Sequence, residues 1–408
     1  MERLIAPWRT LLRRRAFVVL LTCNLLLGLA TSFVGPFMSM FGTLEVRMSP
    51  LVFSVFMTIT SVSAIVIGTY LAHRSDLHYS RRTMLVLGCG AGFVGYAGYA
   101  FVRDPLTLTL IGSLVLGIAS IVFSQLFAYA REELGRAGIP ARELPLYMNV
   151  FRLTFALAWT IGPAVAAWVM VKYRYRGMFL VSAGTYLVLI GVVLVFVPAL
   201  PPNGAVRSLG RLSLREALRR GDLLAHFAAF VLIFLAGTLS MLDLPLLVLG
   251  ELGGREQQVG IVYSVAPFFE LPFMYYVGFL ATRGDQTRII RAGFALAILY
   301  YLGLSLVQAP WHVYLVQILS AAVTAVVAGV AISFFQSYLP NYPGSATNIY
   351  VSAQRAGSTV AYLVFGPLAA AIGHRSIFLI CAASSVAALA LLFTRTRRPV
   401  ATSGAVPA

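Results

Sequence analysis

Long apolar segments dominate the chain, and short stretches with charged, proline or glycine residues separate them. Six such segments come first, at about 16–41, 51–72, 83–102, 106–130, 145–171 and 178–198. After a polar stretch, six more follow at about 223–249, 258–281, 288–308, 311–337, 345–371 and 375–395. A helix crosses the hydrocarbon core of a bilayer with about 20 such residues. Strands of a β-barrel alternate over about 10 residues instead, so the pattern predicts twelve membrane-spanning helices.

The second six segments repeat features of the first six in the same order. The sequence Leu71–Asp76, at the end of segment 2, recurs 209 residues later as Leu280–Asp285, at the end of segment 8. Further pairs are Gly28 and Pro36 with Gly237 and Pro245, Phe123–Gln125 with Phe334–Gln336, and Arg152, Gly162 and Pro163 with Arg355, Gly366 and Pro367. An ordered series of matches indicates a duplication. We therefore expect an all-α integral membrane protein with six-helix bundles at 1–198 and 223–408, joined by a cytoplasmic linker at 199–222.

The composition excludes several classes of protein. Of the 408 residues, 59% are hydrophobic and only 11% are charged, and the mean hydropathy is +0.86. These values exclude a soluble globular protein and leave no room for a large catalytic domain. The net charge of +17 does not indicate nucleic-acid binding, because the arginines lie between apolar segments and form no continuous basic surface. Cys23, Cys89 and Cys381 lie in separate apolar segments and are expected to be neither disulfides nor metal ligands.

The distribution of Lys and Arg predicts the orientation. Both termini and the even-numbered loops carry 22 of these residues, and the opposite loops carry 7. Cytoplasmic loops are the ones enriched in positive charge, so both termini are expected in the cytoplasm. Arg13–Arg15 precede an apolar segment that is longer than a signal-peptide core, and we expect it to be retained as the first span.

No catalytic motif is visible in the sequence. The five histidines lie at or near segment ends without the spacing of a metal site. There is no GxxxxGK[ST] sequence, so we expect neither ATP hydrolysis, nor a metal, nor a cofactor. The pattern favours a transporter driven by a gradient, and a polytopic membrane enzyme or a non-transporting sensor stays open as an alternative. Turnover of a lipid-linked substrate by the purified protein would distinguish that alternative.

Four ionisable residues lie within the apolar segments, where a charged side chain costs several kcal/mol. Glu270 lies near the middle of segment 8, between Pro267 and Pro272. Burial favours the neutral form of a carboxyl group and a nearby cation favours the charged form, which suits a residue that binds and releases a proton. Asp243 and Arg152 are further candidates for proton coupling. A fixed ion pair for Glu270, a helix-capping role for Asp243 and snorkelling of Arg152 to the membrane surface remain as alternatives.

Several motifs resemble those of a known family. Gly68-x-x-Leu71-Ala72-x-Arg74-x-Asp76, followed by Arg81-Arg82, resembles the signature loop of the major facilitator superfamily, and Gly162-Pro163 is similar to the core of its antiporter motif. Five further segments resemble the bacterial sugar efflux transporter family. They are Asp104–Leu108, Gln125–Glu132, Leu157–Pro163, Asp243–Leu246 and Glu270–Pro272. One departure is Val34, where the resemblance leads us to expect a glutamine.

The resemblance implies a major facilitator fold in the inner membrane of a bacterial cell, with a cavity between the two halves. It implies export of sugars or glycosides by proton antiport through alternating access. It also implies that Arg152 and Glu270 lie on facing helices, where protonation of Glu270 would weaken an ion pair. A multidrug exporter for lipophilic compounds is the alternative within transport. The expected substrate-binding residues are Asn24, Gln125, Asp243, Gln336, Asn348, Gln354 and Arg355. The expected residues for conformational gating are Gly68, Asp76, Arg81, Arg82, Gly162, Pro163 and Asp285. We expect function as a monomer in the lipid bilayer, with protons and a small sugar as ligands.

Overall fold

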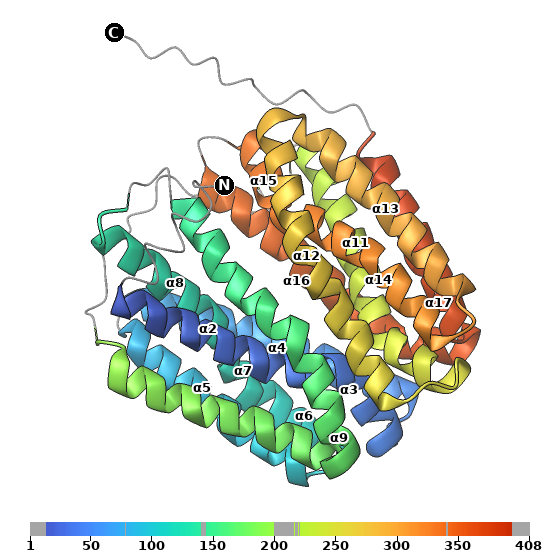
Figure 1. Cartoon of the computed structure of the whole chain (residues 1–408), viewed down its shortest axis with the longest axis horizontal. Coiled ribbons are helices and arrows are strands. Elements are labelled where there is room, and N and C mark those ends of the chain that lie inside the picture. The colour runs from blue at the N-terminus through green and yellow to red at the C-terminus, as the bar shows by residue number, and fades with distance from the viewer. Residues whose placement is uncertain are drawn as a thin grey trace.

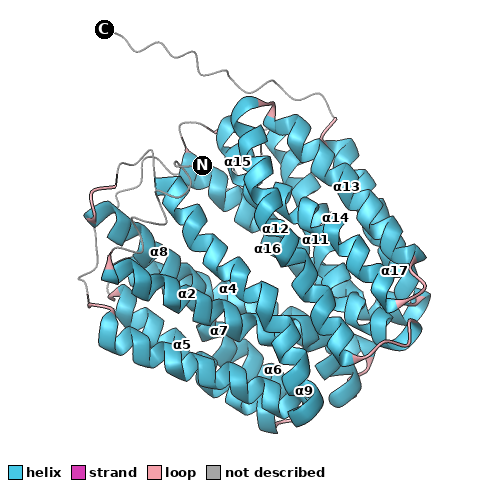
Figure 2. Cartoon of the chain, viewed as in Figure 1, coloured by secondary structure: helices cyan, strands magenta, loops and turns pink. Residues whose placement is uncertain are grey.

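The computed structural model describes residues 14–77, 79–139, 144–199, 216, 219, 221–339 and 342–393, and these residues form helices and short connections but no strand. Figure 2 shows helix along nearly the whole described chain. The first helical elements are α2 (Arg15–Val34), η1 (Gly35–Phe37), α3 (Met38–Met40), η2 (Phe41–Glu45), α4 (Pro50–Leu77), α5 (Arg81–Phe101), α6 (Pro105–Leu110), η3 (Ile111–Val115), α7 (Leu116–Ala119), α8 (Ile121–Arg136) and α9 (Leu144–Phe196). The remaining ones are α11 (Gly221–Leu246), η4 (Leu247–Glu251), α12 (Glu256–Arg283), α13 (Gln286–Leu306), α14 (Pro310–Gly329), α15 (Ala331–Tyr338), α16 (Pro343–Ile372) and α17 (His374–Leu391).

Eleven segments of the described chain are long and apolar enough to cross a membrane. The fifth of them, Val150–Phe196, contains 47 residues, about twice what one crossing needs. Arg174 interrupts it with a non-helical φ of 58° and ψ of −170°, and Figure 1 shows the chain reversing direction there. The predicted all-α membrane fold is confirmed. Counting the two limbs of α9 separately would give the expected twelve crossings, a number that stays a prediction.

The helices form two groups that follow the chain order. In Figure 1 the blue-to-green helices make one group and the yellow-to-red helices the other. We call them the first bundle, α2 to α9, and the second bundle, α11 to α17. α4 packs against α16, and α9 packs against α12, across the boundary between the bundles. The expected linker at 199–222 lies almost entirely outside the described residues, so the domain boundaries stay a prediction.

Helix ends use the capping chemistry that the sequence offers. Asp104 precedes Pro105 at the start of α6, and its carboxylate accepts hydrogen bonds from the Thr107 hydroxyl at 2.7 Å and the Thr107 backbone N–H at 2.8 Å. These two bonds lower the pKa of Asp104 below its ordinary value. Asp285 caps α13 in the same way, with its carboxylate 2.8 Å from the backbone nitrogen of Thr287. The gating candidate Asp285 therefore starts a helix.

The bundles approach each other closely at two contacts. We call the end where α2 begins and α17 ends the terminus side, and the opposite end the far side. Near the far side, the backbone N–H of Gly366 in α16 donates to the Ser54 hydroxyl of α4 at 2.6 Å. Phe53 and Phe365 pack beside this bond with ring centroids 5.9 Å apart. The second contact between bundles places Gly260 of α12 so close to the Pro163 carbonyl of α9 that a Cβ would lie 2.6 Å from it.

Candidate functional site

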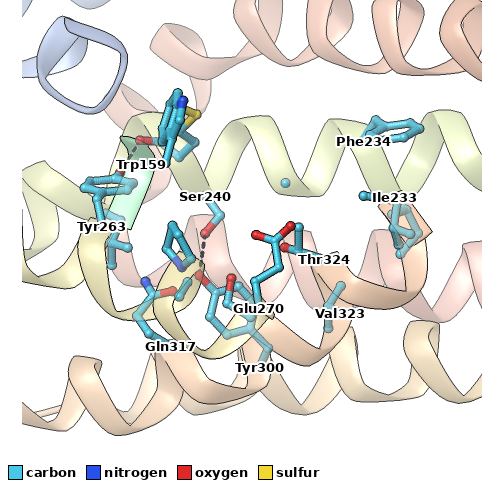
Figure 3. Close-up of a pocket in the computed structure, with 18 of the residues that line it drawn as sticks. Trp159, Ile233, Phe234, Ser240, Tyr263, Glu270, Tyr300, Gln317, Val323 and Thr324 are labelled. Carbon is cyan, nitrogen blue, oxygen red and sulfur yellow. Dashed lines mark hydrogen bonds between the residues drawn. The ribbon is translucent and has the colours of Figure 1, made fainter. Parts of the chain in front are cut away.

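A cavity of about 320 Å³ lies among the helices of the second bundle. Residues of α11, α12, α13, α14 and α16 line it, and the first bundle contributes Trp159 of α9. Figure 3 shows Trp159 beside Tyr263 at one end of this cavity and Ile233 and Phe234 at the other. The expected cavity between the halves is therefore built mainly from the second bundle, and Trp159 is the residue of the first bundle that lines it.

Polar groups of the cavity gather around Tyr300 of α13. Its hydroxyl lies 3.5 Å from the Ser240 hydroxyl of α11, and Gln317 and Ser320 of α14 also line this region. Thr324 and Gln354 add a hydroxyl and an amide to the wall. A hydroxylated ligand would find several donors and acceptors at fixed positions on this wall.

Aromatic side chains supply the apolar part of the wall. Trp159, Tyr263, Phe234 and Tyr350 line the cavity, and the Tyr263 hydroxyl is held by a 2.6 Å hydrogen bond to the carbonyl of Met241. Flat rings next to hydroxyl and amide groups suit a ligand that has one apolar face and a polar rim.

Glu270 is the acidic residue of this cavity, and Figure 3 shows its carboxylate pointing into it. Arg152 of α9 is the basic residue whose charge acts on it. Among the ion pairs of the described residues, however, none joins Arg152 and Glu270 within 4.0 Å. The guanidinium instead donates to the Ala328 carbonyl at 3.2 Å. Ala328 lies beside the break between α14 and α15, where the helix leaves a carbonyl available.

Asp243 lies outside the cavity, although its neighbours on α11 line it. Its side chain is 0% exposed, and one carboxylate oxygen lies 2.6 Å from Nδ1 of His374, the first residue of α17. These two residues are 131 positions apart in the sequence, and no local spacing indicated that they would meet. The predicted coupling candidates therefore occupy two different places, Glu270 in the cavity and Asp243 between α11 and α17.

Gln125 belongs to a polar cluster at the terminus side of the first bundle. Its Oε1 accepts hydrogen bonds from the Ser75 hydroxyl at 2.9 Å and from the Arg81 guanidinium at 3.1 Å. Arg81 also forms an ion pair with Glu132 at 3.1 Å. We call Ser75, Arg81, Gln125 and Glu132 the bracing cluster. It ties the end of α4 to α5 and α8, and it contains one expected substrate residue and one expected gating residue.

The other expected substrate residues are dispersed. Asn24 is 0% exposed and donates to the Phe151 carbonyl at 2.5 Å and to the Thr154 hydroxyl at 2.8 Å, which joins α2 to α9. Gln336 donates to Thr347 at 3.3 Å. The exposed Arg355 reaches across to the Thr69 hydroxyl of α4 at 3.4 Å, and Asn348 is exposed. Of the predicted site residues, Glu270 and Gln354 are those that line the cavity.

The remaining gating candidates lie at close contacts. A Cβ on Gly68 would lie 2.9 Å from the Ser120 hydroxyl, and one on Gly162 would collide with Ser32. Arg82 of α5 donates to the Leu194 carbonyl at 2.6 Å, near the end of α9. The side chain of Asp76 lies outside the described part of the structure.

Sequence reasoning missed most of the polar wall. Gln317, Ser320 and Thr324 recur at intervals of three and four residues in an otherwise apolar segment, which places them on one face of α14. Ser240 lies three residues after Gly237 on α11, and both line the cavity. A search for polar stripes at helical spacing inside apolar segments would have found these residues.

Comparisons with known proteins identify the class. The family model of the Major Facilitator Superfamily matches residues 20–362 and 227–408. The nucleoside transporter NupG has 15% sequence identity and a TM-score of 0.75, covering 93% of this chain and 99% of its own. A POT family transporter in complex with a thioalcohol-conjugated peptide has 13% identity and a TM-score of 0.73, covering 92% of this chain and 94% of its own. At these identities the two structures establish the fold alone.

Relatives in sequence narrow the family. A Deinococcus radiodurans protein that carries the name of a sugar efflux transporter is 34% identical over 92% of this chain and 96% of its own length. Sugar efflux transporter A of Escherichia coli is 28% identical over 90% of this chain and 92% of its own. The chain belongs to the major facilitator superfamily and, within it, to the sugar efflux transporter family. It is thus a multi-pass membrane transporter and not an enzyme.

Proposed function

We propose that this chain exports sugars or glycosides by proton antiport, and that the cavity of the second bundle is the substrate site. The observation that carries the proposal is the carboxylate of Glu270 in a cavity with hydroxyl and amide groups on one wall and aromatic rings on another. The names of the related proteins support a sugar as the substrate. Tyr300, Gln317 and Gln354 would bind sugar hydroxyls, and Trp159 would contact the apolar face of the ring.

Glu270 and Arg152 would link proton binding to the movement of the bundles. Arg152 belongs to the first bundle, and both of its candidate partners, Glu270 and the Ala328 carbonyl, belong to the second. An ionised Glu270 attracts the guanidinium, whereas a protonated Glu270 leaves it on the carbonyl. Protonation would therefore change a contact between the bundles and shift the balance between inward-open and outward-open states.

The orientation follows from the loop charges. We propose that the terminus side faces the cytoplasm of a bacterial cell and that the chain lies in the inner membrane, because positively charged loops remain inside. The far side, where Gly366 meets Ser54, would then face outward and be closed in this structure. We further propose that one chain is sufficient for transport, since both bundles of the alternating-access unit lie in it.

A proteoliposome assay with the purified protein tests the proposal. We expect counterflow of radiolabelled lactose, glucose or a thioglycoside, and acceleration by an imposed pH gradient. Glu270→Gln should retain counterflow and lose the response to the pH gradient. Glu256→Gln is the matched control, because Glu256 lies at the start of the same helix, outside the cavity.

Two results would contradict this function. A full response of Glu270→Gln to the pH gradient would exclude Glu270 as the coupling residue. Absence of sugar movement together with pH-driven movement of a lipophilic dye would indicate a multidrug exporter. Val34, the departure from the family pattern, does not favour that alternative, because its side chain is 3% exposed and packs in the core, away from the cavity.

A further inference from the structure

Asp243 and His374 form an isolated polar pair between two helices of the second bundle. Asp243 lies on α11 with an exposed fraction of 0%, and His374 begins α17 with 29% of its side chain exposed. One Asp243 oxygen lies 2.6 Å from Nδ1 of His374, and the other has no hydrogen-bond partner in the described structure. A buried carboxylate with a single partner is an expensive arrangement, so the proton content of this pair affects how well α11 and α17 pack.

The proton balance of the pair is simple. With one proton shared between the carboxyl group and the imidazole, the two side chains together carry no net charge. When that proton leaves, a net negative charge remains at the fully buried Asp243, and only a neutral imidazole faces it. His374 is partly exposed at the far side, so the proton can be exchanged with water there without passing through the cavity.

The surrounding groups do not supply a compensating charge. Glu251 and Arg375 lie nearby but neutralise each other in an ion pair of 2.8 Å. Tyr263 of α12 and Cys381 of α17 also face Asp243, and both side chains are neutral near pH 7. Tyr300 of α13, which approaches α11 through the Ser240 hydroxyl, is neutral as well.

The first bundle shows that the fold does not require this pair. Pro36 corresponds to Pro245 in the repeat, so Val34 corresponds to Asp243. His374 directly follows Gly373, which has a φ of 75°, and Tyr175 directly follows Arg174, which has a φ of 58°. The positions of the first bundle that correspond to the pair are therefore Val34 and Tyr175, which are 3% and 7% exposed. A protonatable pair at an equivalent corner points to a function beyond packing.

The pair is also next to the substrate site. Ser240 and Leu244, three residues before and one residue after Asp243, line the cavity. Tyr263 donates to the Met241 carbonyl at 2.6 Å and so joins α12 to the same stretch of α11. A change in the packing of α11 at Asp243 would therefore move the wall of the cavity.

We propose that Asp243 and His374 form a proton-binding site separate from Glu270, filled from the water at the far side, whose occupancy sets the packing of α11 against α17 beside the cavity. The effect on transport rests on the proposed function, but the protonation and its effect on stability do not. The site would make the transporter sensitive to pH on the far side independently of the coupling carboxylate.

Thermal unfolding of the purified protein as a function of pH tests the site without any substrate. The unfolding temperature of the unmodified protein should fall by a few degrees between about pH 6 and about pH 8, where a histidine loses its proton. Asp243→Asn, which keeps a hydrogen-bonding side chain but can neither hold the shared proton nor leave a buried negative charge, should remove this dependence. His73→Gln, which replaces an exposed histidine at the end of α4, should leave it unchanged.

A second variant keeps the test valid if the first variant does not fold. Asp243→Val combined with His374→Tyr introduces the residue types of the first bundle and should fold with a pH-independent unfolding temperature. Retention of the full pH dependence in either variant would overturn the proposal. In proteoliposomes, sugar counterflow by Glu270→Gln should still depend on far-side pH. Adding Asp243→Asn to this variant should abolish that dependence. If no sugar moves at all, the proposed function fails while the unfolding experiment still decides the proton site.

Discussion

The two bundles use the same backbone design at the far side. Beyond the end of α2, the chain passes Pro36 and reaches the π-helical turn Phe41–Glu45. α11 contains Pro245 near its end and is followed by the π-helical turn Leu247–Glu251. A residue with positive φ follows each turn, Arg47 at 59° in the first bundle and Gly253 at 63° in the second. The duplication has thus preserved an unusual turn although the residues around it changed.

The terminus side shows a second preserved contact. Arg82 of α5 donates to the Leu194 carbonyl, and Arg291 of α13 donates to the Leu392 carbonyl, each at 2.6 Å. Both arginines lie near the start of one helix and bind a free carbonyl at the end of another. Arg82 and Arg291 are 209 residues apart, the same offset as the signature sequences.

The polar chemistry, in contrast, has diverged. The first bundle contains the bracing cluster around Gln125, and the residue that corresponds to Arg81 in the second bundle is the fully buried Ile290. The second bundle contains the cavity and Glu270. The comparison teaches that the two halves share these contacts of the backbone, whereas the bracing cluster lies in one half and the cavity mainly in the other.

Among the substitutions considered, one at the contact between the bundles should have the largest effect on stability. A Cβ on Gly366 would overlap the Pro50 carbonyl, which is backbone and cannot move away, whereas one on the corresponding Gly162 meets the Ser32 side chain of its own bundle. We expect Gly366→Ala to destabilise the closed far side by about 1–3 kcal/mol. Ser264 of α12 lies between the bundles, where its hydroxyl accepts a 3.2 Å hydrogen bond from the Ala164 backbone N–H of α9. A Ser264→Cys reporter should then be labelled faster by an impermeant maleimide from the far side.

Gly162→Ala is the matched control for this experiment. It should lower the unfolding temperature without increasing the labelling of Ser264→Cys, because its new contact lies within one bundle. Equal labelling in the two variants would show that Gly366 has no special part in closing the far side.

A substitution in the bracing cluster should have the next largest effect on stability. Arg81→Ala leaves Glu132 without its ion-pair partner, with side-chain exposures of only 17% and 15% for the two residues. We expect a loss of about 2 kcal/mol in the free energy of unfolding and slower transport. Arg291→Ala removes hydrogen bonds to the Leu392 carbonyl and the contact of the guanidinium with the Phe393 ring, and it should cost about 1 kcal/mol. A smaller loss for Arg81→Ala than for Arg291→Ala would contradict a bracing role.

Substitutions at the turns with positive φ should have the smallest effect on stability. Gly373→Ala forces a side chain into the left-handed region at a φ of 75°, where nothing else crowds it, and should cost about 1 kcal/mol. Arg174→Gly should have the opposite sign, because it relieves the same conformation. The ion pair that it removes, Arg174 with Glu45 at 4.0 Å, joins a 75% exposed side chain and contributes little. Calorimetric unfolding temperatures of both variants measure the difference.

Much of the architecture could be predicted because it depends on local properties of the chain. The expected segment 16–41 corresponds to the span Arg15–Glu45, and the expected segment 51–72 to the span Pro50–Ser75. The membrane fold and the family are confirmed. The sequence predicted segments 5 and 6 as separate helices, whereas the structure has one helical element, α9, that is interrupted at Arg174. A single residue with positive φ is enough to reverse the chain there.

The site could be predicted only in part, because the roles of polar residues depend on which helices meet. Glu270 and Gln354 line the cavity as expected, while Asn24 joins α2 to α9 and Gln125 joins the bracing cluster. All four are polar residues in apolar segments, and periodicity treats them alike. Their roles in transport stay predictions.

The sequence by itself determined that this chain crosses a membrane repeatedly, that its halves are duplicated and that it resembles sugar efflux transporters. Hydropathy and repeated motifs carry this information because the cost of exposing a backbone or a charge to lipid applies to each segment separately. Only the tertiary structure decided that the cavity belongs mainly to the second bundle, that Arg152 binds a carbonyl at a helix break, and that Asp243 meets His374. Those arrangements arise from contacts between residues far apart in the chain, and their energies depend on burial and distance that no single segment contains.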